Sequence, residues 1–188
     1  FLLFVIVLQF LYPSDRALPF ARIDDTSVGW KTSDELMPLL TDGFADASVT
    51  ITASTQKTTV KLSDTGASLK SDTAADQLTS YPWWQRLLPF SALIRRPIVT
   101  HMPLDFNDTK LASAAETLAN NLHSEPKNGE VSVTDDGEVT VSAAEDGVTV
   151  STDTLKNALK TAALRFGDNA ITVTPQLKSP SVTNDMVS

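Results

Sequence analysis

Residues 145–159 read EDGVTVSTDTLKNAL, in which a glycine, a short extended segment and an amphipathic helical segment follow one another. Residues 64–78 read DTGASLKSDTAADQL and repeat this order of residue types. Similar side chains fill most aligned positions, and the identical pairs are Gly66 and Gly147, Asp72 and Asp153, Thr73 and Thr154, and Leu78 and Leu159. Internal similarity of this kind predicts that one structural unit occurs twice in the chain.

Helical segments are predicted before and within both stretches. Thr32 followed by Glu35 is a capping box, which predicts the start of a helix. A longer helix is predicted after Asp105 or Asn107, because apolar residues recur there at three- and four-residue steps: Leu111, Ala115, Leu118 and Leu122. The helix that begins near Leu155 is predicted to include Phe166 on its apolar face and to stop at Gly167.

Strands are predicted where apolar and polar residues alternate. Such alternation occurs over residues 49–62 and again over residues 131–141. The second stretch contains Asp135-Asp136-Gly137, a strong signal for a hairpin turn, and a last strand is predicted from Ala170 to Thr174. We therefore expect an α+β fold with two pseudo-repeated helix–hairpin–helix units, over residues 22–97 and 98–185.

The N-terminal segment is strongly apolar. Residues 1–12 read FLLFVIVLQFLY, in which Gln9 is the one plainly polar side chain. Twelve helical residues rise ~18 Å, whereas the hydrocarbon core of a bilayer is ~30 Å thick. We expect residues 1–13 to be the end of a transmembrane anchor of a single-pass protein, with the soluble part outside the cytoplasm. A buried core helix and a remnant of a signal peptide are the alternatives.

The composition excludes several kinds of chemistry. Fifteen Lys and Arg residues oppose twenty-three Asp and Glu residues, and a net charge of −8 argues against nucleic-acid binding. The absence of Cys excludes disulfides, thiolate metal sites and cysteine nucleophiles. Two His residues are too few for a three-histidine zinc site. No catalytic residue, metal site or cofactor is predicted.

An aromatic segment separates the two predicted units. Residues 81–97 read YPWWQRLLPFSALIRRP and hold two of the three Trp residues. The prolines in this segment prevent one long helix. We select Tyr81, Trp83, Trp84 and Arg86 as the candidate binding residues.

Three roles compete for these residues. The first is packing in a seam between the units, which predicts that Trp83 or Trp84 is mostly buried while Arg86, Arg95 and Arg96 lie at the surface. The second is contact with a membrane interface. The third is stacking on glycan rings or on a partner. The sequence leaves all three roles open.

Four other motifs are assigned ordinary structural roles. Ser124-Glu125-Pro126-Lys127 has the spacing of a catalytic Ser–x–x–Lys pair, but the proline and the Asn-Gly that follows predict a loop. His101 and His123 are predicted to be solvated. Asp135-Asp136-Gly137 lacks the ligand pattern of a calcium loop. Asn107-Asp108-Thr109 has the form of a glycosylation sequon and is predicted to start a helix.

The order of the segments resembles a known family. An apolar N-terminal run is followed by ALPFARIDDTSVGW at residues 17–30 and by the two helix–hairpin–glycine–helix rounds. The second round ends in ITVTPQLKSPSVTND at residues 171–185. This order is similar to the peptidoglycan-binding repeat found beside VanW-like domains and before bacterial L,D-transpeptidase domains. Asp105 to Thr183 fits one complete unit, and residues 22–80 fit a divergent first unit.

The resemblance implies a bacterial envelope protein whose partner is peptidoglycan or another envelope protein. The transpeptidase chemistry of the neighbouring domains needs a cysteine, which this chain lacks. We therefore expect a non-catalytic, membrane-anchored extracytoplasmic module that contacts peptidoglycan or envelope partners. The alternative is a structural subunit of a membrane-anchored surface assembly. The oligomeric state stays open.

Overall fold

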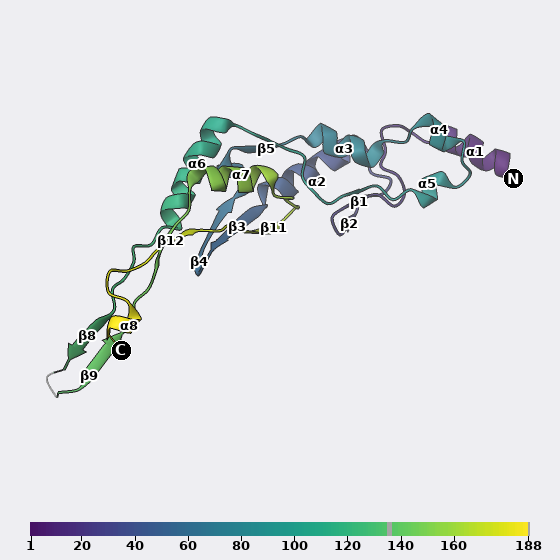
Figure 1. Cartoon of the computed structure of the whole chain (residues 1–188). Coiled ribbons are helices and arrows are strands. Elements are labelled where there is room, and N and C mark those ends of the chain that lie inside the picture. The colour runs from purple at the N-terminus through teal and green to yellow at the C-terminus, as the bar shows by residue number, and fades with distance from the viewer. Residues whose placement is uncertain (135–136, 188) are drawn as a thin grey trace. The chain divides into compact units, whose positions relative to one another are not determined.

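The computed structural model describes residues 1–134 and 137–187. It has an α+β structure in which short strands form several small sheets (Figure 1). The residues group into two compact units, each assembled from three stretches of chain. The first unit contains Phe1–Ser48, Lys61–Asn107 and Ala163–Asn169, and the second contains Val49–Val60, Asp108–Ala162 and Ala170–Ser188.

The first unit combines helices with very short strands. Its helices are α1 (Leu2–Phe10), α2 (Ser33–Ala45), the 3-10 turn η1 (Leu62–Thr65), α3 (Ser71–Thr79), α4 (Trp83–Arg86) and α5 (Ser91–Ile94). Its strands are β1 (Arg22–Ile23), β2 (Thr26–Ser27), β5 (Ala67–Leu69), β6 (Ile98–Val99) and β7 (Leu104–Phe106). Strand β1 pairs antiparallel with β2 and parallel with β6, and β5 pairs antiparallel with β7.

The apolar face of α2 packs against α3 in the core of the first unit. Leu36 and Leu40 of α2 are fully buried, as are Ala74 and Leu78 of α3. Burial of each leucine side chain stabilises the fold by roughly 1.5–3 kcal/mol. Ile23 of β1 belongs to the same cluster, so this core also fixes the strand pair that β1 forms with β2.

The second unit holds the longer strands. The sheet of β3 (Ser48–Ala53), β4 (Gln56–Lys61) and β11 (Asp168–Thr172), in the order β11-β3-β4, has most of its residues in this unit. Two further strand pairs are β8 (Glu130–Val133) with β9 (Val139–Ser142), and β10 (Gly147–Thr149) with β12 (Gln176–Lys178). The helices are α6 (Asp108–Asn121), α7 (Thr152–Thr161) and α8 (Asn184–Val187).

Helix α6 packs against α7 in the second unit. Their buried side chains follow the predicted helical spacing and include Leu111, Leu118, Leu155 and Leu159. Strand β3 buries alternate residues, Val49, Ile51 and Ala53, as its apolar–polar alternation predicts. In α6, α7 and β3 the local pattern therefore specifies which side of the element is buried.

The prediction of two pseudo-repeated helix–hairpin–helix units is wrong. The hairpin of β3 and β4 extends into a three-stranded sheet with β11, whereas β8 and β9 form a two-stranded sheet in which every residue is exposed. Strand β5 pairs with β7, which lies beyond residue 97 in the chain. Alternation identifies a strand and its buried face, but it does not identify the partner strand.

The matched glycines also have different structural roles. Gly66 has a φ of 78° and ends η1, so it occupies the left-handed region that glycine tolerates best. A Cβ atom at Gly147 would lie 2.7 Å from the backbone nitrogen of Pro126 and 2.8 Å from the carbonyl oxygen of Ser124. Gly66 thus serves a turn, whereas Gly147 allows two backbones to approach closely.

No membrane-spanning helix is present over residues 1–13, where the end of an anchor was expected. Helix α1 covers nine residues, and its buried side chain is the polar Gln9, whose amide nitrogen donates to the carbonyl oxygens of Arg86 and Leu88. Over residues 1–134 and 137–187, no helix is long and apolar enough to cross a bilayer. The predicted membrane-helix remnant and the single-pass membrane localisation are therefore corrected.

The C-terminal end of α7 differs from the prediction, whereas the hairpin of β8 and β9 is present. Helix α7 ends at Thr161, so the prediction that it includes Phe166 and stops at Gly167 is wrong; both residues lie in the first unit. The hairpin of β8 and β9 is present, with Gly137 at a φ of 78°, whereas Asp135 and Asp136 of the predicted turn lie outside the described residues. The boundaries 22–97 and 98–185 stay a prediction that limited proteolysis can test.

Candidate functional site

Tyr81, the first of the candidate binding residues, is buried. Its hydroxyl group lies 2.7 Å from the Ser91 hydroxyl group. Its ring meets the Tyr12 ring edge to face, with 6.2 Å between the ring centroids. The guanidinium carbon of Arg86 lies 4.9 Å from the centre of the Tyr81 ring. These contacts make Tyr81 a packing residue that holds the start of the aromatic segment.

Arg86 is partly buried, although a surface position was expected, and it joins α4 to the end of α1. Its Nη1 donates to the carbonyl oxygens of Phe10 and Tyr12, each at 3.1 Å, and its Nε donates to the carbonyl oxygen of Tyr81 at 3.1 Å. A cation next to the free carbonyl groups at a helix C-terminus is electrostatically favourable. Arg86 therefore positions α4 through three backbone contacts.

Trp83 and Trp84 both lie on the surface, with exposed fractions of 69% and 53%. The prediction that at least one of them is mostly buried is therefore wrong. They belong to the single turn α4, none of whose residues is buried. Two neighbouring exposed aromatic rings on a fixed turn are available for stacking on a ligand.

The sequence around this turn carries positive charge only. No Asp or Glu occurs between residues 77 and 104, whereas Arg86, Arg95 and Arg96 do, in a chain whose net charge is −8. Arg95 is partly buried and donates to the side-chain oxygen of Gln85. Arg96 is exposed, with its guanidinium carbon 5.6 Å from the centre of the Phe20 ring. The segment is therefore suited to a ligand that carries carboxylates.

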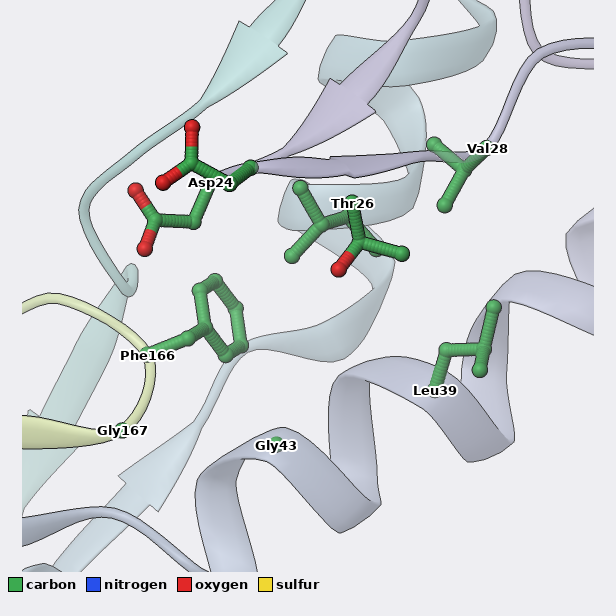
Figure 2. Close-up of a pocket in the computed structure, with 9 residues that line it drawn as sticks. Asp24, Thr26, Val28, Leu39, Gly43, Phe166 and Gly167 are labelled. Atoms are coloured by element: carbon green, nitrogen blue, oxygen red, sulfur yellow. The ribbon is translucent and has the colours of Figure 1, made fainter.

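A second candidate site is a pocket of about 290 Å³ within the first unit (Figure 2). Asp24, Asp25 and Thr26, at the connection from β1 to β2, form one side. The ring of Phe166 faces the same space from the segment 163–169 (Figure 2). The other lining residues are Ile23, Val28, Leu39, Gly43 and Gly167. The pocket thus combines carboxylates with an apolar wall.

Sequence reasoning missed this pocket. Phe166 was assigned to the apolar face of α7, because it continues the helical spacing of Leu155 and Leu159. The pair Asp24-Asp25 belongs to ALPFARIDDTSVGW at residues 17–30, which contributes to the family resemblance but predicts no site. The sequence contains one signal, because a glycine directly after Phe166 is compatible with a turn as well as with a helix end. In the structure Gly167 has a φ of 85°, which suits a turn.

A third hollow, of about 510 Å³, lies within the second unit. It is lined by Ser54, Thr55, Gln56, Ser124, Glu125, Lys127, Glu145, Asp146, Val148 and Leu177. The Lys127 ammonium group lies 2.7 Å from a Glu145 carboxylate oxygen, so its charge is already balanced. Most of the side chains that line this hollow are polar and can donate or accept hydrogen bonds.

Of the four other motifs, Asp135-Asp136-Gly137 lies partly outside the described residues, and the other three are described. Ser124 and Lys127 lie in non-helical chain and form backbone bridges to Val148 and Glu145, so the geometry of a catalytic Ser–Lys pair is not present. His123 contacts Glu125 at 3.0 Å, and His101 contacts Thr100. Among the described residues, no group of three or more His, Asp or Glu side chains could hold a metal ion.

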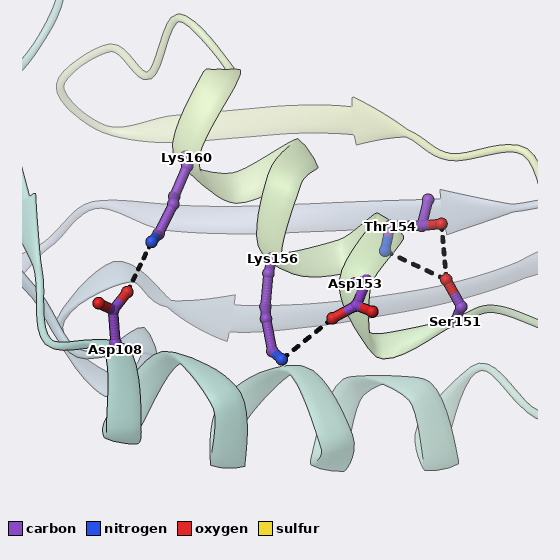
Figure 3. Close-up of polar contacts among 6 residues, drawn as sticks. All are labelled: Asp108, Ser151, Asp153, Thr154, Lys156 and Lys160. Carbon is purple, nitrogen blue, oxygen red and sulfur yellow. Dashed lines mark hydrogen bonds and ion pairs between the residues drawn. The ribbon is translucent and has the colours of Figure 1, made fainter.

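Polar contacts fix the two packed helices of the second unit (Figure 3). Helix α6 begins at Asp108, which confirms the predicted start, and Lys160 of α7 donates to the Asp108 carboxylate at 2.6 Å. This hydrogen bond and the lysine charge lower the pKa of Asp108. Ser151 caps α7 by accepting a hydrogen bond from the Thr154 backbone N–H group.

Comparison with known proteins gives one match. A protein-family model described as "Putative peptidoglycan binding domain" matches residues 58–172, which is more than half of the chain. The matched range includes the turn with Trp83 and Trp84, and Phe166 of the pocket, while Asp24 and Asp25 precede it. Neither the curated proteins nor the solved structures contain a match.

Proposed function

Because the chain belongs to the family of peptidoglycan-binding domains, we propose that it is a non-catalytic module that contacts peptidoglycan through Trp83 and Trp84. The family match over residues 58–172 is the observation that carries this proposal. Tyr81 and Arg86 position the two tryptophans: the Tyr81 ring contacts the Arg86 guanidinium group, and Arg86 binds α4 to the end of α1.

The exposure of the two tryptophans supports this role. A pyranose ring presents C–H groups on its faces, and an indole ring can cover such a face and remove apolar surface from water. Rings that are 69% and 53% exposed have most of this surface available. Because α4 is held by three hydrogen bonds from Arg86, less conformational entropy is lost when a glycan binds.

The charge of the segment supports the same partner. Peptide stems of peptidoglycan end in carboxylates, and guanidinium groups bind carboxylates through charge-assisted hydrogen bonds. Arg96 is exposed. The segment between residues 77 and 104 contains no Asp or Glu, so no carboxylate of this segment can pair with Arg96 in place of a ligand. A catalytic role is left out of the proposal, because the chain has no cysteine and Lys127 pairs with Glu145 instead of a nucleophile.

Sedimentation with purified sacculi tests this proposal. The parent chain is compared with Trp83→Ala, Trp84→Ala and the double variant. Each single change is expected to weaken binding by about five- to tenfold, which corresponds to about 1–1.4 kcal/mol. Trp30→Ala is the matched control, because Trp30 is 56% exposed but lies outside the matched range.

Two results would contradict the proposal. A parent chain that stays in the supernatant at every sacculus concentration would remove peptidoglycan as the partner. A double variant that sediments like the parent chain would remove Trp83 and Trp84 as the contact. Melting temperatures of the Trp83 and Trp84 variants should stay close to that of the parent, because no residue of α4 is buried.

The hairpin of β8 and β9 favours a second candidate function, a structural subunit that packs against copies of itself. Val131 pairs with Val141 and Val133 pairs with Val139, so the four valines share one face of the hairpin. All four are exposed. Sedimentation equilibrium tests this candidate: a dimer that dissociates in Val131→Thr/Val141→Thr supports it, and a monomer at all concentrations contradicts it.

A further inference from the structure

We propose that the pocket bounded by Asp24, Asp25 and Phe166 binds an alkyl ammonium group, such as the side-chain amine of a diamino acid. The site is part of the first unit and lies apart in sequence from Trp83 and Trp84. The chemical class of the ligand follows from the pocket alone. Its assignment to a peptidoglycan peptide stem rests on the proposed function.

The acidic side of the pocket is held by backbone contacts. Ile23 and Thr26 are paired residues of β1 and β2, so Asp24 and Asp25 form the two-residue connection between them. The backbone N–H group of Asp24 donates to the carbonyl oxygen of Val99 at 2.9 Å. The φ of Asp24 is 48°, a conformation that Asp and Asn adopt more readily than most residues. The backbone at Asp24 is thus fixed, and its carboxylate lies at one end of the pocket (Figure 2), while the Asp25 side chain is exposed to solvent.

The charge at this end is incompletely balanced. Asp25 has one cationic neighbour, Arg22, at 3.7 Å, and both side chains are exposed. Within the described residues, the carboxylate of Asp24 makes no hydrogen bond or ion pair. Two adjacent carboxylates with one arginine leave net negative charge, which favours a cation and repels an anion.

The opposite wall is apolar. Phe166 packs against the core cluster of the first unit, and its ring faces Gly43 of α2 (Figure 2). Leu39 of the same helix also lines the pocket. A Cβ atom at position 43 would lie 2.9 Å from Cδ1 of Phe166, so the glycine allows the ring to lie close to the helix. An aromatic face attracts a cation, and the adjoining aliphatic side chains can cover a methylene stem.

The volume of the pocket and the chemistry of its two sides limit the class of ligand that it can bind. A volume of about 290 Å³ accommodates a single side chain rather than a disaccharide. A metal ion would require more ligating groups than two carboxylates, and no cluster of three exists in the described residues. An ammonium group on an aliphatic stem satisfies both sides of the pocket, since its charge meets the carboxylates and its methylene groups meet the apolar wall.

Calorimetric titration of the complete chain tests this inference with Nα-acetyl-lysine amide as the probe. Nα-acetyl-norleucine amide is the matched uncharged probe, because it keeps a four-carbon side chain and lacks the ammonium group. We expect the lysine probe to bind with a Kd on the order of 1 mM. The norleucine probe is expected to bind at least about tenfold more weakly.

Variants locate the site. Asp24→Asn removes the charge while keeping a residue that tolerates positive φ, and it should weaken lysine-probe binding at least about fivefold. Phe166→Leu should weaken binding of the lysine probe as well. Asp46→Asn is the control, because Asp46 is exposed at the end of α2 and does not line the pocket. Circular dichroism and melting temperatures establish that each variant is folded.

The outcomes separate this inference from the proposed function. Equal binding of the two probes, no saturable binding of the lysine probe, or an unchanged affinity in folded Asp24→Asn would overturn the ammonium site. These results would leave sedimentation with sacculi through Trp83 and Trp84 unaffected. Conversely, lysine-probe binding that Asp24→Asn weakens, in a chain that does not sediment with sacculi, would support the ammonium site and contradict the proposed function.

Discussion

The Nζ atom of Lys160 lies 2.6 Å from a carboxylate oxygen of Asp108 and thereby joins α7 to the first turn of α6 (Figure 3). Asp108 also lies where the positive end of the α6 dipole favours an anion. The hydrogen bond from Lys160 is the largest cause of its lowered pKa, followed by the lysine charge. The folded state therefore prefers the ionised form of Asp108.

The first prediction concerns the pH dependence of this contact. A carboxyl group whose pKa is lower in the folded state stabilises the fold when it is ionised, and that contribution disappears as the pH falls through the lowered pKa. Asp108→Asn should therefore lower the melting temperature at pH 7, and the difference from the parent should shrink in acid. Asp146→Asn is the control, because Asp146 is exposed and lies outside both α6 and α7. An equal difference at pH 7 and at acidic pH would contradict the linkage.

The second prediction concerns the start of α2. The Thr32 hydroxyl group accepts a hydrogen bond from the Glu35 N–H group at 3.3 Å, and the Glu35 carboxylate accepts one from the Thr32 N–H group at 2.8 Å. Thr32→Ala should lower the free energy of unfolding by about 0.5–2 kcal/mol, measured by urea denaturation. Thr32→Ser should retain most of the stability. Equal losses in both variants would mean that the hydroxyl group is not the source of the effect.

The third prediction distinguishes two kinds of glycine. Gly147→Ala places a Cβ atom within 2.8 Å of backbone atoms that cannot move independently, and it should destabilise the chain by about 1–3 kcal/mol. Gly137→Asn should cost much less, because no atom lies within 4 Å of its Cβ position and Asn tolerates a φ of 78°. Chemical denaturation of both variants provides the comparison. A Gly147→Ala variant as stable as the parent would contradict the close approach.

Local patterns in the sequence predict local structure well in this chain. The capping box at Thr32 and the hairpin of β8 and β9 are present, because each depends on residues only a few positions apart. The helix start at Asp108 is also present. In each case one short segment contains both the hydrogen-bond donor and the acceptor, or both paired strands.

Long-range pairing was not predictable from the same patterns. The alternation of β3 indicates which residues are buried, but not that β11 pairs with it from more than a hundred residues away. The similarity around Gly66 and Gly147 suggested equivalent units, although one glycine needs positive φ and the other needs space. Residue type alone does not distinguish these two requirements.

The candidate site was predicted only in part. Trp83 and Trp84 were selected for their aromatic character, yet their exposure depends on how α4 is held by Arg86 and α1. The apolar run of residues 1–12 suggested a membrane helix. In the structure Gln9 is buried, and its side chain donates hydrogen bonds to the carbonyl oxygens of residues 86 and 88. Phe166 was placed on the wrong element, because α7 ends five residues before it.

Tryptophan fluorescence tests most directly whether Trp83 and Trp84 contact peptidoglycan. The chain has three Trp residues, so a Trp30→Phe background leaves these two as the only reporters. On titration with solubilised peptidoglycan fragments, their emission should shift to shorter wavelength, and acrylamide should quench it less, as the exposed rings leave water. Unchanged emission and quenching at saturating fragment concentrations would contradict the claim that the two rings form the contact.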